Sequence, residues 1–189
     1  MLRALTFDYW DTLYEGAALP ERVALTPGDR REPLAAADAV DNALLMLPPA
    51  MLAGAWQTLR ALARRFTLAV IGDTGMASGR AQDRLLEKDG ARSFFAATIY
   101  SVDVGHAKPR PEIFAAAVQT LGIPPGEILH VGDDERTDVR GALAAGFRAV
   151  RLDVVRAGGP SEAEFVARSF EELREYLTAS TSASPRTAP

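Results

Sequence analysis

Five short apolar runs, each followed directly by a glycine or an aspartate, constrain the fold of this chain more than any other feature of its sequence. The runs occupy residues 2–7, 67–71, 97–102, 128–131 and 149–152. Continuous apolar runs of this length are typical of strands that are buried on both faces of a sheet. The sequence therefore predicts a sheet whose strands lie in the interior of the domain.

Helical patterns alternate with these runs. The predicted helices cover residues 53–65, 79–89, 111–121 and 137–145, and a last edge strand at 165–167 precedes a closing helix at 169–177. Pro111 in a first turn and Gly122 just past a last turn support the third helix. Ser169, with Glu172 three residues later, supports the start of the closing helix. Alternating strands and helices predict an α/β fold, a doubly wound parallel sheet with helices on both faces.

One internal segment and one terminal segment interrupt this alternation. Residues 16–51 begin with polar, turn-forming residues and then contain one predicted helix at 35–47, which two prolines stop. Residues 178–189 are small and polar, and we expect them to be disordered. The expected organisation is a core of residues 1–15 and 52–177 with a short insertion at 16–51.

Composition excludes several classes of protein. The 21 basic and 25 acidic residues give a net charge of −4 with no basic block, which argues against a nucleic-acid partner. The absence of cysteine excludes disulfide scaffolds and thiolate metal sites, and it fits a cytoplasmic location. No apolar run reaches the ~18 residues that a membrane helix needs, and the first residues do not resemble a signal peptide. We expect a cytoplasmic globular protein.

Acidic residues follow several of the predicted strands. Asp8, Asp73 and the pair Asp133 and Asp134 stand at strand ends, and ligands of open parallel sheets bind outside those ends. Carboxylates around one crevice repel each other unless a cation or a proton intervenes. A hard cation such as Mg²⁺ prefers oxygen ligands, so Mg²⁺ is the ion expected to bind these carboxylates. His130 lies within a predicted strand and is expected to be a hydrogen-bonded core histidine.

Four segments together carry a resemblance to a known family. Residues 7–13, Phe-Asp-Tyr-Trp-Asp-Thr-Leu, resemble the first motif of the haloacid dehalogenase-like (HAD) hydrolase superfamily. Residues 68–73 stand where its second motif would be, and Lys108 in the run 106–114 is similar to the third motif. The Gly-Asp of residues 130–138, with another Asp five positions on, resembles the fourth. The motifs occur in the family's order and cover most of residues 1–152.

The resemblance implies a phosphoryl-transfer site. Asp8 would be the nucleophile that forms an aspartyl-phosphate, which water then hydrolyses. Lys108 would neutralise Asp8 and the transferring phosphoryl oxygens, and Thr12 would stabilise the loop after the first strand. The implied sheet has the first strand at its centre, between the strands that end at Gly72 and Asp133.

The resemblance also implies a metal site and a phosphate site. Mg²⁺ would be held by Asp8, by the backbone carbonyl of Trp10 and by Asp133, with Asp138 supporting the metal or its waters. Gly72, Asp73, Thr74 and Lys108 would bind the phosphate of the substrate, with backbone N–H groups and the Thr74 hydroxyl as donors.

Two residues depart from the family pattern. Trp10 stands where family phosphatases have the aspartate that protonates the leaving oxygen, and an indole cannot do this. Asp11, one position later, is an alternative acid. Gly72 stands where the second motif has a phosphate-binding serine or threonine.

The expected function is that of a HAD-like hydrolase, a Mg²⁺-dependent phosphatase of a small-molecule phosphate, weakened by the loss of the acid. One alternative is a 2-haloacid dehalogenase, because halide needs no proton to leave and those enzymes also lack an aspartate at the position of Trp10. Their fourth motif is not of the metal-binding kind, however, so Asp133 and Asp138 argue against this. Another alternative is a catalytically weak binding or assembly protein of the same fold.

The insertion at 16–51 stands where the family has its helical cap. It is short for a complete cap, and helix 35–47 carries more apolar surface than an isolated helix leaves in water. We therefore expect a reduced cap that leaves the site exposed, or a cap completed by a partner chain in a homo-oligomer.

Overall fold

The structure, a computed structural model, describes residues 1–16, 33–74, 77–155 and 158–182. The turn-rich start of the predicted insertion and the end of the chain lie outside the described residues. Within the described part, no helix has the length and the apolar character that crossing a membrane requires.

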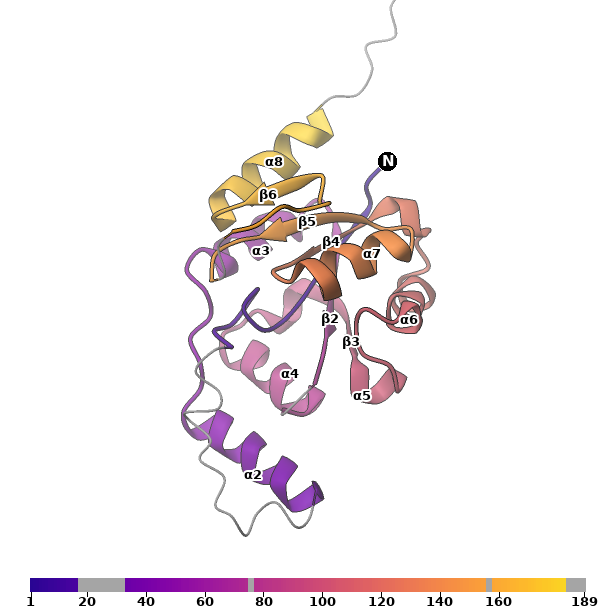
Figure 1. Cartoon of the computed structure of the whole chain (residues 1–189). Helices are drawn as coiled ribbons and strands as arrows, with labels where there is room; N and C mark the ends of the chain where they lie inside the picture. The colour runs from indigo at the N-terminus through magenta and orange to yellow at the C-terminus, as the bar shows by residue number, and fades with distance from the viewer. Residues whose placement is uncertain (17–32, 75–76, 156–157, 183–189) are drawn as a thin grey trace, which may run out of the picture.

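Six parallel strands form a single sheet in the order β3-β2-β1-β4-β5-β6 (Figure 1). The strands are β1 Ala4–Phe7, β2 Thr67–Gly72, β3 Phe95–Tyr100, β4 Ile128–Gly132, β5 Arg148–Leu152 and β6 Phe165–Ala167. β1 pairs with β2 on one side and with β4 on the other. The predicted doubly wound α/β sheet with a central first strand is confirmed.

Helices cover both faces of the sheet (Figure 1). The helices of the described residues are α2 Pro33–Met46, which lies at one end of the molecule, α3 Ala55–Leu62, α4 Gly79–Lys88, α5 Ser101–Val104, α6 Pro111–Leu121, α7 Arg140–Ala144 and α8 Phe170–Ser182. Short helical turns are η2 Arg92–Phe94, η3 Pro125–Glu127 and η4 Glu135–Val139. α6 begins at its proline and ends at Gly122, which has a φ of 64°. Only glycine adopts such a φ without strain, so the helix ends there.

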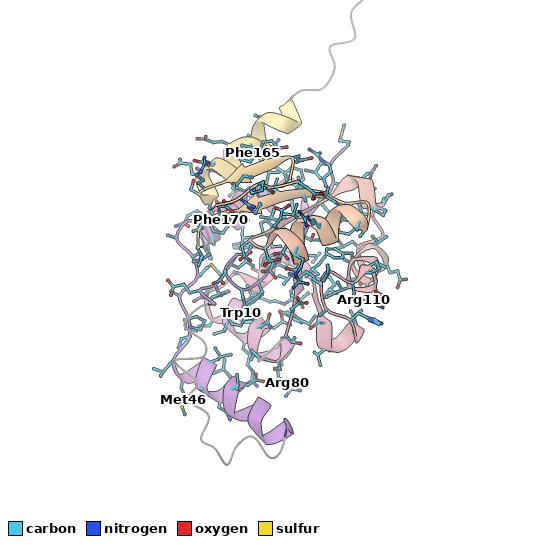
Figure 2. All side chains as sticks on the ribbon, viewed as in Figure 1. Trp10, Met46, Arg80, Arg110, Phe165 and Phe170 are labelled. Atoms are coloured by element: carbon cyan, nitrogen blue, oxygen red, sulfur yellow. The ribbon has the colours of Figure 1, made fainter. Side chains whose placement is uncertain are left out.

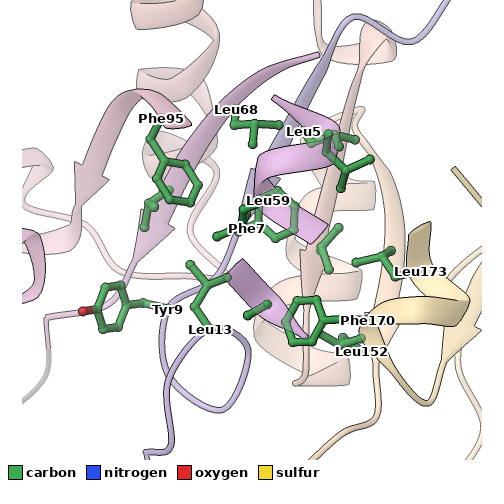
Figure 3. Close-up of a cluster of buried hydrophobic side chains, with 14 of the residues drawn as sticks. Leu5, Phe7, Tyr9, Leu13, Leu59, Leu68, Phe95, Leu152, Phe170 and Leu173 are labelled. Carbon is green, nitrogen blue, oxygen red and sulfur yellow. The ribbon is translucent and has the colours of Figure 1, made fainter. Parts of the chain in front are cut away.

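Two hydrophobic clusters pack against opposite faces because successive strand residues point to opposite sides. On one face, Leu5 and Phe7 of β1 pack with residues of α3, α4 and α8 (Figure 3). On the other face, Ala4 of β1 packs with Ile113 and Phe114 of α6 and with residues of α7. β1 is therefore buried on both sides, which fixes the position of the loop that follows it.

Two predicted boundaries need correction. The strand predicted at 97–102 lies at Phe95–Tyr100, because Ser101 and Val102 begin α5 and the side chain of Val102 is largely exposed. α8 continues to Ser182, into the segment 178–189 that we expected to be disordered, because no glycine or proline interrupts it before that point. The amide of Glu172 donates to the Ser169 hydroxyl at 3.1 Å, as predicted for that helix start.

α2 packs against α4 at one end of the molecule (Figure 1). Val40 and Leu44 of α2 are buried with Ala77, and the partly buried Trp10 packs against them. The Asp41 carboxylate accepts hydrogen bonds from the Ser78 amide at 2.9 Å and from its hydroxyl at 2.5 Å. α2 is thus attached directly to the loop that follows β1 and to the start of α4.

Candidate active site

Three buried carboxylates gather at the carboxyl ends of β1 and β4. Asp8 follows β1, Asp133 follows β4, and Asp138 lies in η4. Each offers an oxygen atom within 4.8 Å of the others, and all three residues are buried. The structure therefore brings together the three carboxylates for which the sequence predicted a metal-binding role.

Local backbone structure explains how Asp138 reaches this cluster. A Cβ atom added to Gly132 would lie 2.3 Å from the Cγ of Asp138, so only glycine leaves room for that carboxylate. The Asp134 side chain accepts hydrogen bonds from the amides of Arg136 and Thr137 and so caps the start of η4. The wide turn of η4 then directs Asp138 back toward the end of β4.

Lys108 is the cation at the centre of this cluster. Its buried ammonium forms ion pairs with Asp8 and with Asp138, the second at 2.6 Å. Its backbone amide donates to the carboxylate of Asp73 at 3.0 Å. Asp73, which follows β2, thus holds the Lys108 backbone, while the Lys108 ammonium contacts Asp8, which follows β1.

The electrostatic balance of the cluster follows from its burial. Burial raises the pKa of the Asp8 carboxyl to about 8, although the Lys108 ammonium opposes that rise. Burial acts to raise the pKa of Asp138 as well, but Lys108 and His130 hold it well below its ordinary value. Burial lowers the pKa of the Lys108 ammonium, yet Asp138 and Asp8 raise it above its ordinary value. Of Asp8 and Asp138, the two carboxyl groups that pair with Lys108, Asp8 is thus the one at which burial opposes ionisation more strongly.

Thr12 lies beside the carboxylates, at the end of a tight loop. The amide of Leu13 donates to the Tyr9 carbonyl at 2.9 Å, which closes the loop. The Thr12 hydroxyl is 3.3 Å from an oxygen of Asp8 and 3.5 Å from one of Asp133. Thr12 therefore links the residues that follow two neighbouring strands.

Trp10 and Asp11 point to other partners. The Trp10 ring contacts the edge of Tyr9, with centroids 4.7 Å apart, and lies on the side of the core that faces α2 (Figure 2). Asp11 adopts a φ of 57°, and its carboxylate accepts a hydrogen bond from the Gly16 amide at 2.8 Å. Trp10 thus packs between core and α2, and Asp11 holds the backbone of its own loop.

Three of the four residues expected to bind phosphate, Gly72, Asp73 and Thr74, lie at the end of β2 and just after it, and the fourth is Lys108. A Cβ atom at Gly72 would lie 3.1 Å from Gln82 and 3.2 Å from the Tyr100 ring, so this position is crowded. The amide of Thr74 donates to the Ser101 hydroxyl at 2.9 Å, and the two hydroxyls are also 2.9 Å apart. The sequence did not predict this contact of Ser101, because the strand expected at 97–102 included that residue.

Comparisons with known proteins agree with this fold and identify its family. The family of haloacid dehalogenase-like hydrolases matches residues 25–146. The 5-amino-6-(5-phospho-D-ribitylamino)uracil phosphatase YigB of Escherichia coli is 37% identical over 92 residues, which cover 49% of this chain and 35% of the relative. The structure of a HAD phosphatase from Thermococcus onnurineus aligns with a TM-score of 0.74 at 22% identity, covering 93% of this chain and 98% of the other.

The L-2-haloacid dehalogenase of Xanthobacter autotrophicus aligns with a TM-score of 0.70 at 19% identity, over 94% of this chain and 99% of that one. Likenesses at this level of identity concern the fold. The family match covers more than half of the chain, so this chain belongs to the haloacid dehalogenase-like hydrolases. The chain spans about a third of the length of the curated phosphatase that it matches.

The charge balance leads to a prediction about stability. Lys108→Met removes the ammonium that two buried carboxylates contact, so the free energy of unfolding should fall by about 3–5 kcal/mol. Asp8→Asn removes one of the three like charges and keeps the Lys108–Asp138 pair, so it should change stability by less than about 1 kcal/mol or increase it. Urea denaturation in the presence of a chelator measures both. Equal losses in the two variants would contradict this account of the cluster.

Proposed function

We propose that the chain is a Mg²⁺-dependent phosphatase of small-molecule phosphates that uses Asp8 as its nucleophile. The observation that carries the proposal is the group of three buried carboxylates with one ammonium at the carboxyl ends of β1 and β4. Buried carboxylates in this number are costly unless a cation joins them. The family membership and the curated phosphatase relative support the same reaction class.

The donor set fits a hard divalent cation. The clustered side chains offer only carboxylate oxygens, which Mg²⁺ prefers, and the single ammonium leaves the cluster short of positive charge. Asp8, Asp133 and the backbone carbonyl of Trp10 would hold the ion, and Asp138 would support it. When bound, Mg²⁺ supplies the charge neutralisation that phosphoryl transfer requires.

Each side chain of the site would have a distinct role in the reaction. A carboxylate oxygen of Asp8 attacks phosphorus, a new P–O bond forms, and the P–O bond to the leaving oxygen breaks with its electron pair. Lys108 keeps the Asp8 carboxylate in place and faces the negative charge of the transferring group. Water then attacks phosphorus, the P–O bond to Asp8 breaks with its electron pair, and the Asp8 carboxylate is restored while inorganic phosphate leaves and the remaining proton of the water passes to solvent. Gly72, Asp73 and Thr74 would border the bound phosphate.

The surroundings of Trp10 favour substrates with good leaving groups. The indole N–H is far too weak an acid to protonate a leaving oxygen, and the Asp11 carboxylate accepts a hydrogen bond from the Gly16 amide. The leaving oxygen must therefore depart as an anion or take its proton from water. Acyl and aryl phosphates meet this condition better than alkyl phosphates do.

In this proposed enzyme, residues 16–51 would form a reduced cap on a core of residues 1–15 and 52–177. α2 is its described helix, and Asp41 and Leu44 attach it to the core next to Trp10. A cap of this size covers little of the site, which suits an exposed substrate or a homo-oligomer whose second copy completes the cover.

The central test compares hydrolysis by Asp8→Asn and by the unmodified chain. With millimolar Mg²⁺, the chain should release inorganic phosphate from a panel of acyl and aryl phosphates, and a chelator should stop the release. Asp8→Asn should abolish turnover, because an amide cannot act as this nucleophile. Asp103→Asn, an exposed acid on α5, is the matched control and should leave turnover unchanged.

Residual turnover above about a tenth of the control in Asp8→Asn would exclude Asp8 as the nucleophile. Release of halide from a 2-haloacid without any phosphatase activity would favour the dehalogenase alternative. The absence of both activities would favour a binding or assembly role.

The missing acid leads to a prediction about substrate preference. Trp10→Asp should raise the rate for an alkyl phosphate, relative to an aryl phosphate, by a factor of about 10²–10⁴, the usual contribution of general acid catalysis. Because the indole packs against α2, the substitution also leaves a cavity. The ratio of the two rates within one variant cancels any loss of folded protein. An unchanged ratio would show that the missing acid does not limit this protein.

A further inference from the structure

Two polar side chains interrupt the apolar face of the sheet beneath α6 and α7. Thr6 and His130 are partners in the register of β1 and β4, and both are fully or almost fully buried. The Thr6 hydroxyl lies 2.9 Å from Nδ1 of His130. The His130 ring also contacts the edge of the Phe114 ring, with centroids 5.6 Å apart. A buried polar pair on an apolar face is costly unless its hydrogen bonds are satisfied.

The other ring nitrogen of His130 reaches the candidate active site. Nε2 lies 3.3 Å from Oδ1 of Asp138. An ionised carboxylate only accepts hydrogen bonds, so Nε2 carries the hydrogen of this contact. Thr6 then holds the opposite nitrogen, which fixes the orientation of the ring. The pattern is the one found where a histidine is oriented through the nitrogen that does not serve its functional partner.

Asp138 passes this orientation on to Lys108. The same Oδ1 atom accepts from the Lys108 ammonium at 2.6 Å, while Oδ2 accepts from the Asp134 amide at 2.9 Å. Lys108 in turn contacts Asp8, which stands two residues after Thr6. The hydrogen-bonded chain Thr6–His130–Asp138–Lys108–Asp8 thus begins and ends on the same segment of the central strand.

We propose that Thr6 and His130 are positioning residues that orient the Asp138 carboxylate and, through it, the Lys108 ammonium toward Asp8. This inference rests on the phosphatase function proposed above. A purely apolar packing role is the competing explanation. That role would require neither the Thr6 hydroxyl nor the contact of a His130 nitrogen with the Asp138 carboxylate. In metal sites, residues that hydrogen-bond to the ligating groups and so orient them contribute about 10- to 100-fold to metal affinity or activity.

The test compares three substitutions of buried threonines. Thr6→Val removes the hydroxyl and keeps the shape of the side chain, and Thr6→Ser restores a hydroxyl. Thr58→Val is the matched control, because Thr58 is equally buried and its hydroxyl donates to the Phe170 carbonyl at 3.2 Å, on the other face of the sheet. All three are made in the full chain, and urea denaturation establishes that each is folded.

Two measurements distinguish positioning from packing. For an aryl phosphate with Mg²⁺, Thr6→Val should lower kcat by about tenfold and leave KM within about twofold, because Lys108 acts on the transferring group. Thr6→Ser should recover most of the lost rate, and Thr58→Val should leave kcat unchanged. In nuclear magnetic resonance spectra, the Nε2 proton of His130 should be protected from exchange in the unmodified chain and in Thr58→Val, and lose that protection in Thr6→Val.

The proposal is overturned if Thr6→Val keeps the kcat of Thr58→Val, or if the Nε2 proton is equally protected in both. If the unmodified chain hydrolyses no phosphate at all, the proposed function fails. The protection of the Nε2 proton then decides by itself whether Thr6 orients His130.

Discussion

The ion pairs of Lys108 with Asp8 and Asp138 are the interaction on which the rest of this structure depends. They join the residue that follows β1, η4 and the loop before α6, so one ammonium connects three separate segments of the site. The cluster remains short of positive charge, since a third carboxylate, Asp133, lies within reach. A site built in this way is expected to cost stability, and the proposed function would offset its negative charge with a divalent cation.

The sheet is what makes this concentration of charge possible. β1 is buried on both faces and lies between β2 and β4, so the loops after these three strands meet at one edge. Gly132 allows Asp138 to approach the end of β4, and Asp73 holds the Lys108 backbone. Apolar packing thus positions the strands, and a few polar contacts set the geometry of the charged groups.

Much of this arrangement could be predicted from the sequence, because it depends on local patterns. The apolar runs and the acids behind them identified the strands and placed Asp8 and Asp133 at one edge of the sheet, and the resemblance to the family's motifs added Lys108. The Thr6–His130 pair was not predicted, since it depends on the register of strands that lie far apart in the sequence. The contact of Trp10 with α2 likewise depends on where an inserted helix packs, which local sequence patterns do not specify. The end of α8 was misjudged because polar composition resembles disorder when packing is unknown.

Chemical trapping tests the central claim, that Asp8 accepts a phosphoryl group, most directly. The protein is mixed with Mg²⁺ and an aryl phosphate, denatured in acid during turnover, digested, and examined by mass spectrometry. The account predicts a phosphoryl group on Asp8 that hydroxylamine removes, as expected of an acyl phosphate. Release of inorganic phosphate with no phosphoryl group on Asp8, or with one on another residue, would contradict it.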